Sequence, residues 1–234
     1  FDRDNKHITL THAGEHFYEY SQRFLELEEK MKMEINSCNT YSKIINIGCV
    51  NCIYNCHLKP HISQLMNKHT NICLNVILDH SRHLLNRLHD NSIDVCFSYL
   101  ATNEISYKCI PYKTDEIIFV TNSQNIQFSN GIHNGEILHL PIIYSKFMPK
   151  SGFDWIHDIF PPHYVFQFTI SVIKEIIPFL LQYPYYAFLP RKLIEKELKD
   201  GLLIEIPLLD YHIPPLQSYI IMKSNAKYNP LDYF

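Results

Sequence analysis

The sequence predicts an α/β protein of two Rossmann-like lobes, preceded by a long helix. Three observations support this prediction. Helical and β-rich patterns alternate from residue 43 onward, which is typical of parallel sheets covered by helices on both faces. A polar stretch at residues 123–135 divides the alternation into two units. An apolar heptad pattern occupies the part of the chain before the alternation begins.

A long helix is predicted at residues 11–36. Thr11 supplies a hydroxyl that can cap its first turn, and apolar side chains recur along it at alternating spacings of four and three. This apolar seam consists of Ala13, Phe17, Tyr20, Phe24, Leu27 and Met31. A heptad seam can pack on its own domain or pair two chains as a coiled coil. We favour the pairing of two chains, because no apolar partner element lies next to the seam in the sequence.

The alternating patterns define the elements of the two lobes. The first lobe is assigned residues 43–122 and 215–234, with strands at 44–50, 72–78, 93–99, 105–112, 116–121 and 217–222 and helices around 58–66 and 84–88. The second lobe is assigned residues 123–214, with strands at 138–144, 164–168, 185–189 and 202–208 and helices at 153–160, 172–181 and 191–199. Gly201 suits the C-cap of the last helix.

The composition limits what the chain can do. Hydrophobic residues make up 46% and the net charge is −3 over 234 residues, so the chain can bury a core but has no basic surplus for DNA. No common catalytic or nucleotide-binding motif is present, so we predict neither an enzyme nor a cofactor. Seven cysteines in no even framework, without a secretory leader, favour the cytoplasm. The apolar runs are too short to span a bilayer, so no membrane partner is expected.

One cluster of cysteines and histidines invites a metal or redox interpretation. Cys49, Cys52, Cys56, His57 and His61 form the pattern C-x2-C-x3-C-H-x3-H. The pattern matches no closed zinc site, and a thiol at a helix N-terminus could instead be redox-active. We favour a third interpretation, in which the cysteines are small buried apolar residues, and we predict no metal.

The first residues resemble a segment of the LysR-type bacterial transcriptional regulators. L-T-H-A-G-E at Leu10–Glu15 is similar to the L-T-x-A-G-E that ends the wing and opens the linker helix in that family. F-D-R-D at Phe1–Asp4 resembles the F-x-R of the wing. The resemblance implies that residues 1–10 are the remnant of a winged helix-turn-helix and that residues 11–36 form the linker and dimerisation helix.

Later motifs resemble the regulatory domain of the same family, in the family's order. I-N-I-G-C-V at Ile45–Val50 resembles the first strand, L-K-P-H-I at Leu58–Ile62 the first helix, and S-I-D-V-C-F at Ser92–Phe97 the third strand. F-L-P at Phe188–Pro190 and D-G-L-L at Asp200–Leu203 match late motifs. The resemblance implies two lobes of periplasmic-binding-protein type II topology, with an effector site between them.

The sequence departs from the family pattern at both ends and in the second lobe. The helix-turn-helix is missing before Phe1, so this chain is not expected to read an operator. Little room follows Lys223 for the usual C-terminal helix. Where the family has A-G-x-G, this chain has Q-Y-P-Y at Gln182–Tyr185. These bulky rings are expected to narrow or fill the cleft. The aromatic stretch Tyr183–Phe188 could wall a ligand pocket or form a core strand.

Polar side chains follow the predicted strands, where ligands of such folds bind. The candidate effector site consists of Asn51, Cys52, Ser81, Ser98, Tyr99, Tyr144, Ser145 and Thr169. In the family that the chain resembles, the corner after the first strand offers a small polar side chain and free amides to an effector carboxylate, so we expect a small anionic metabolite. Helix caps and turn residues are an equally open interpretation of these positions.

The resemblance implies the effector-binding and dimerisation region of a DNA-binding regulator. Its expected partners are a small-molecule effector, identical chains in a homodimer or tetramer, and DNA only through the missing helix-turn-helix. A two-lobed solute-binding receptor of the transport type is the alternative, which the heptad helix and the lack of a signal peptide disfavour. An enzyme on the same scaffold would need a paired acid, base and nucleophile, and none is evident.

Overall fold

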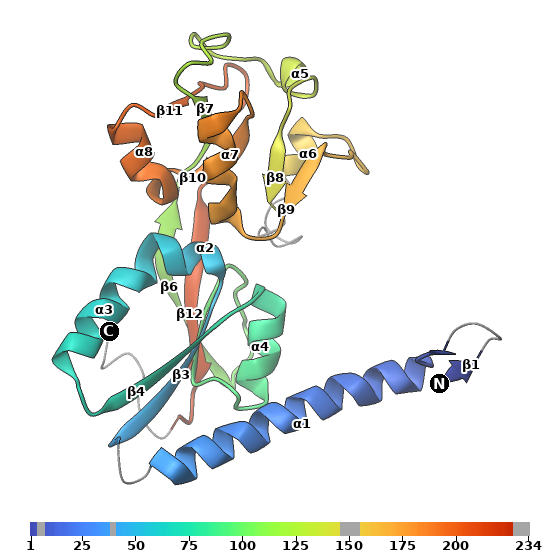
Figure 1. The fold of residues 1–234 in the computed structure, drawn as a ribbon, viewed down its shortest axis with the longest axis vertical. Coiled ribbons are helices and arrows are strands. Elements are labelled where there is room, and N and C mark those ends of the chain that lie inside the picture. Colours follow the sequence, from blue (N-terminus) through green and yellow to red (C-terminus); the bar gives the residue numbers. More distant parts are fainter. Residues whose placement is uncertain (4–7, 38–40, 146–154, 227–234) are drawn as a thin grey trace.

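The computed structural model describes residues 1–3, 8–37, 41–145 and 155–226. Two lobes lie one above the other, and a long helix, α1 (His12–Ser37), extends to one side of the lower lobe (Figure 1). A short hairpin of β1 (Asp2–Arg3) and β2 (Ile8–Thr9) precedes α1. The Thr11 hydroxyl accepts a hydrogen bond from the backbone N–H of Gly14, so Thr11 caps the helix as its sequence predicts.

The first lobe is built on a five-stranded sheet in the order β4-β3-β5-β12-β6. Its strands are β3 (Lys43–Cys49), β4 (Ile72–Leu78), β5 (Val95–Ser98), β6 (Tyr107–Asp115) and β12 (Leu216–Lys223). The first three run parallel, and β12 runs antiparallel between β5 and β6. The connecting helices are α2 (Asn51–Ile53), the π-helical turn η1 (Tyr54–Leu58), α3 (Lys59–Lys68) and α4 (Ser81–His89).

The second lobe holds a three-stranded antiparallel sheet and a short parallel pair of strands. The sheet consists of β10 (Ala187–Pro190), β7 (Ile117–Asn122) and β11 (Leu203–Glu205), with β7 in the middle. The pair consists of β8 (Ile143–Ser145) and β9 (Phe168–Ile170). The helical segments are α5 (Asn134–Ile137), α6 (Trp155–Ile159), η2 (Ile173–Glu175), α7 (Ile176–Gln182), η3 (Arg191–Ile194) and α8 (Glu195–Lys199).

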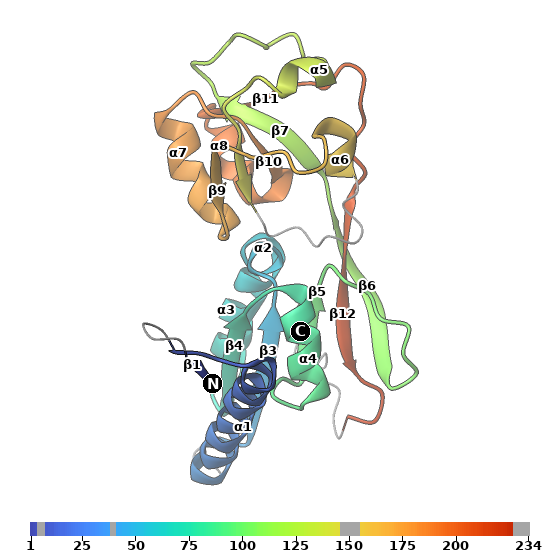
Figure 2. The same cartoon turned by 90° about the vertical axis from the view of Figure 1, so that its right-hand side faces the viewer.

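Two extended segments connect the lobes (Figure 2). Glu116 alone separates β6 from β7, so the chain passes from the first sheet to the second within one long extended run, and β12 brings it back. The sequence predicts residues 116–121 in the first lobe, whereas β7 hydrogen-bonds only within the second sheet among the described residues. The prediction places residues 116–121 beside the preceding strand, because successive strands usually pair with each other. Here β6 and β7 instead continue end to end, so they belong to different sheets.

Several predicted elements differ in their bounds. The strand predicted at 138–144 is confirmed only at its end, in β8, because α5 and a turn occupy its start. The strand predicted at 164–168 begins only at Phe168. The helix predicted at 153–160 corresponds to α6, and residues 153–154 lie outside the described part of the chain. Asp200 is the C-cap of α8, and Gly201 follows it with a φ of +68°, the left-handed conformation that commonly ends a helix.

α1 lies against the first lobe through its polar side. Glu26 pairs with Arg87 of α4, Arg23 approaches Asp90 to 3.6 Å, and Lys30 lies 3.6 Å from Asp94. The apolar seam lies beside these contacts and is not covered by them, and the Arg23 guanidinium lies 5.3 Å from the centre of the Tyr20 ring. Its residues Phe17, Tyr20 and Phe24 remain between 65% and 75% exposed. The helix therefore packs on its own domain through charges and leaves the apolar seam available to another surface.

Candidate functional site

The two lobes meet where the chain leaves β3. α2 contacts η2 of the second lobe, and η1 contacts η3. η2 follows β9, and the carboxyl ends of β8 and β9 point towards the first lobe (Figure 1). The ends of the parallel strands in both lobes therefore face the same junction, as expected for this kind of fold.

The structure brings four predicted residues of the first lobe together. The Ser81 hydroxyl accepts a hydrogen bond of 3.2 Å from the backbone N–H of Tyr99. The phenol of Tyr99 lies against Cys52, and burial, together with this thiol, raises the pKa of Tyr99 well above its ordinary value. Ser98 closes a turn through its hydroxyl, which bonds to both the N–H and the carbonyl of Leu100.

These side chains are buried in the present arrangement of the lobes. Cys52 and Ser98 are fully buried, and Ser81 and Tyr99 are each 6% exposed. Asn51 is half-buried, and its carbonyl and side-chain oxygens accept hydrogen bonds from Asn55. Each residue thus has a structural role in this conformation, and effector binding by this set remains a prediction.

The predicted residues of the second lobe lie on neighbouring strands. Tyr144 on β8 is paired in register with Thr169 on β9, and its ring stacks on Phe166 at 4.4 Å. Thr169 is exposed. Ser145 is 4% exposed, and its hydroxyl makes no hydrogen bond with any residue in the described ranges. A buried hydroxyl without a partner costs free energy, so Ser145 is the member of this group that most needs a ligand or water.

The cysteines of the C-x2-C-x3-C pattern are buried, as the favoured interpretation predicts. Cys49 and Cys52 are fully buried and Cys56 is 5% exposed, with 3.9 Å between the sulfurs of Cys52 and Cys56. The hydrogen bond with Cys52, followed by burial, raises the pKa of Cys56 far above its ordinary range. A raised pKa lowers the thiolate fraction and with it the reactivity of a thiol. Among the residues described here, no group of three or more His, Cys, Asp or Glu side chains could hold a metal ion.

Sequence reasoning misses a polar pair at the junction. Nε2 of His57, on η1, donates to Oδ1 of Asp115 across 2.8 Å, and both side chains are largely buried. Asp115 is the last residue of β6, immediately before the chain crosses to the second lobe. The pair joins residues 58 positions apart. The only sequence feature that could have pointed to this pair is the carboxylate of Asp115, which lies between two β-rich stretches.

The tyrosines of the Q-Y-P-Y turn do not lie at the junction. Pro190, at the end of β10, pairs with Ile117 next to the crossing, and Ala187 at the start of β10 pairs with Val120 further away. The turn precedes β10, so it lies at the far end of the second lobe, where Tyr183 is 45% exposed. The expectation that these rings narrow the cleft is therefore wrong. The aromatic strand itself is core, because Tyr186 and Phe188 are buried against Phe119.

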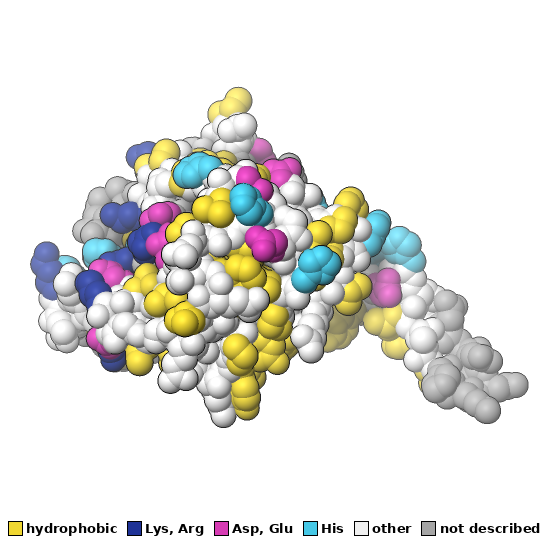
Figure 3. Space-filling view, turned by 90° about the horizontal axis from the view of Figure 1, so that it is seen from above, with side chains coloured by type: hydrophobic (Ala, Val, Ile, Leu, Met, Phe, Trp, Pro, Cys, Tyr) yellow, Lys and Arg dark blue, Asp and Glu magenta, His cyan; other side chains and the backbone are white. Residues whose placement is uncertain are grey.

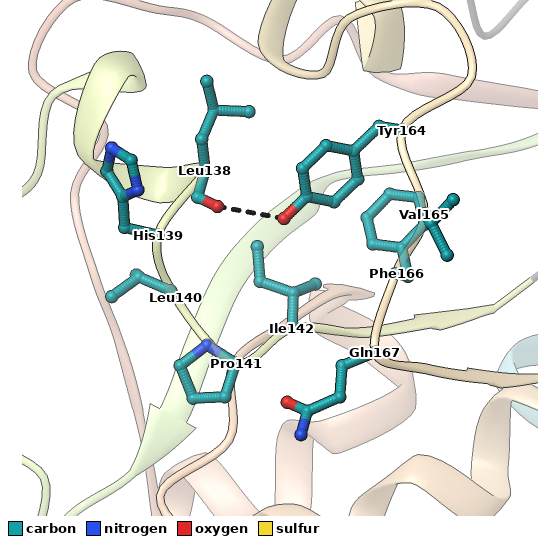
Figure 4. A pocket seen from close by; sticks show the side chains of 9 residues that line it. All are labelled: Leu138, His139, Leu140, Pro141, Ile142, Tyr164, Val165, Phe166 and Gln167. Atoms are coloured by element: carbon teal, nitrogen blue, oxygen red, sulfur yellow. Dashed lines mark hydrogen bonds between the residues drawn. The ribbon is translucent and has the colours of Figure 1, made fainter.

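A pocket of about 330 Å³ opens elsewhere in the second lobe (Figure 4). Residues 138–142 and 164–167 line it, and the hydroxyl of Tyr164 bridges them by donating to the carbonyl of Leu138 at 2.9 Å. These segments precede β8 and β9, so the pocket lies at the strand ends opposite the junction. On the outer face of this lobe, acidic and histidine side chains are scattered among apolar ones (Figure 3). Neither this pocket nor this outer face lies at the junction where the strand ends of both lobes meet.

The geometry defines a two-lobed α/β protein of the kind that binds a ligand between its lobes. The family model described as the LysR substrate binding domain matches residues 39–231. The chain belongs to the family of LysR substrate-binding domains, which are the effector-binding regulatory domains of LysR-type transcriptional regulators. This membership favours a regulator over a transport receptor. The comparison with curated proteins gives no match.

Solved structures share the fold. CrgA of Neisseria meningitidis, a LysR-type transcriptional regulator, is 13% identical with a TM-score of 0.65, and the match covers 95% of this chain and 76% of that one. A mutant of Corynebacterium glutamicum OxyR bound to H2O2 is 17% identical with a TM-score of 0.59, covering 97% and 74%. The effector-binding domain of BenM with its effector benzoate is 16% identical with a TM-score of 0.61, covering 82% and 89%. At these identities the likeness establishes the periplasmic-binding-protein type II fold.

No helix in the described part of the chain is both long and apolar enough to cross a membrane.

Proposed function

We propose that this chain senses a small anionic metabolite that binds at the junction of the lobes. The observation that carries the proposal is the convergence of strand ends from both lobes, where α2 meets η2 and η1 meets η3. The candidate contacts are the eight residues predicted from the sequence. They are Asn51, Cys52, Ser81, Ser98, Tyr99, Tyr144, Ser145 and Thr169.

The effector acts by changing the arrangement of the lobes. Ligand binding can shift such an equilibrium only by as much as its affinity differs between the two arrangements. Two chains pair through the apolar seam of α1 as a homodimer, which can assemble further into a tetramer. The change in lobe arrangement then alters how the two DNA-binding domains of the regulator, which the linker helices join to the lobes, are placed relative to each other. We expect the protein to act in the cytoplasm, without catalytic activity and without a cofactor.

A thermal-shift screen of small carboxylates and other anionic metabolites tests the proposal. A ligand present at one hundred times its dissociation constant stabilises the folded chain by about 2.7 kcal/mol. Any compound that raises the melting temperature is then titrated against Ser145→Ala, with Ser63→Ala on the exposed side of α3 as a matched control. Loss of the Ser145 hydrogen bond weakens binding in the first variant only, by roughly 0.5–1.5 kcal/mol if the ligand oxygen is neutral and by roughly 1.5–3 kcal/mol if it is charged. A screen in which no compound stabilises the chain contradicts the proposal.

A further inference from the structure

Asp115 presents an unsatisfied acceptor at the lobe junction. The residue is 3% exposed, and its backbone pairs with Leu216 of β12, so it lies where both connecting strands pass between the lobes. Oδ1 accepts the hydrogen bond from His57, but Oδ2, which is also buried, makes no hydrogen bond with any described residue. Burying a carboxylate oxygen without a partner is costly, because water would otherwise solvate it.

The groups around Asp115 do not supply the missing positive charge. Cys56, Tyr99 and Tyr112 are neutral, and the charge of Asp115 adds to the effects that keep them protonated. The pKa of Lys192 on η3 is raised mainly by its hydrogen bond with Glu195 and to a smaller extent by the charge of Asp115. The Lys192 ammonium is already paired with Glu195 at 2.5 Å. Apart from His57, the described surroundings of Asp115 therefore leave its negative charge uncompensated.

We propose that the effector carries a protonated amine that donates a hydrogen bond to Oδ2 of Asp115. This inference rests on the proposed function, because it assigns the chemistry of the same site. An ammonium group satisfies both the unpaired oxygen and the uncompensated charge, and charge-assisted hydrogen bonds are the stronger kind. A second carboxylate at this point would be repelled. The anionic end of the effector binds among the eight candidate residues, so the ligand class is a zwitterion of the amino-acid type.

Matched pairs of compounds test this assignment on the whole 234-residue chain. The probes are L-leucine with 4-methylpentanoate, L-phenylalanine with 3-phenylpropionate, and L-glutamate with glutarate. Each pair differs in the α-amine, and binding is measured by thermal shift and calorimetry. We expect at least one amino acid to bind about tenfold or more tightly than its partner without the amine, as for a charged hydrogen bond of about 1.4 kcal/mol or more.

The variant Asp115→Asn should abolish this preference, because it keeps the shape of the side chain and removes the charge. Asp210→Asn is the matched control, since Asp210 is an exposed carboxylate that pairs with His133. Equal binding of acids with and without the amine, or a preference that survives in Asp115→Asn, overturns this inference and leaves the proposed function standing. Failure of every compound, here and in the anion screen, overturns both. If Asp115→Asn does not fold, the matched pairs with the unchanged chain decide the question.

Discussion

Phe24 offers the most direct test of the apolar seam. Its side chain is 70% exposed in the single chain. Full burial of a phenylalanine side chain stabilises by about 1.5–3 kcal/mol, so burial of this exposed part is worth roughly 1–2 kcal/mol in each chain. A twofold dimer buries two copies, which gives roughly 2–4 kcal/mol. Because each 1.4 kcal/mol is a factor of ten, Phe24→Glu should weaken dimerisation by roughly 30-fold to 1000-fold.

Sedimentation equilibrium measures this change as a dissociation constant. Leu25→Glu is the matched control, because Leu25 is a neighbouring apolar residue of α1, 51% exposed, that lies off the seam. Pairing of the lobes themselves could retain some dimer, but the weakening by Phe24→Glu would still appear. A chain that is already monomeric at high micromolar concentration, or equal effects of the two variants, would refute the coiled-coil seam.

Three further predictions concern packing, charge and DNA. Gly48→Ala should destabilise the first lobe by about 1–3 kcal/mol in urea unfolding, because an added Cβ would clash with the Ile93 side chain and lie 2.9 Å from that of Leu84. An unchanged unfolding midpoint would show that these side chains move aside at little cost in free energy. The hydrogen bond from Arg191 lowers the pKa of Glu116 below its ordinary 4.5. The stability from this pair is therefore fully present above about pH 4.5 and lost as the pH falls through the lowered value. Glu116→Gln should flatten the acid side of the stability profile by a small amount, since the pair is exposed. With a net charge of −3, this chain should bind DNA weakly and without sequence preference, so tight, salt-resistant binding in a mobility-shift assay would contradict the assignment.

The sequence predicts the local elements of the first lobe well, because their patterns are strong over short ranges. The strand at residues 72–78 agrees with β4 residue for residue. Its alternation with helices is enough to indicate a parallel sheet. β7 shows the limit of this reasoning. Its sequence identifies it as a strand, but whether it pairs within the first or the second lobe depends on partners about 70 and 80 residues further on, which the local pattern does not contain.

The site was predictable only where topology alone determines it. Residues after β3, β4 and β5 come together because parallel strands end at one edge, which explains why Ser81 meets Tyr99. His57 stands out in the sequence as part of a Cys and His pattern, and its actual partner Asp115 lies in a different element. Sequence spacing shows which residues share a helix. It does not show which buried oxygen lacks a partner, since that depends on every side chain packed around it.

Burial of the candidate residues is compatible with effector binding if the lobes open about their connecting strands. The lobes are linked by β6–β7 and by the return to β12, and they touch through short helical segments, so a rotation about these strands separates α2 from η2 without disrupting either sheet. Opening would expose apolar side chains of the segments in contact, and this cost would lower the affinity of any ligand that needs the open form to enter. A ligand that then pairs with Asp115 and lets the lobes close again recovers that cost. The closed, ligand-bound form would place the ammonium of the ligand against Asp115, whereas in the closed, empty form Oδ2 of Asp115 has no hydrogen-bond partner among the described residues. If the proposal holds, the contact that selects the ligand also biases the equilibrium between the two lobe arrangements.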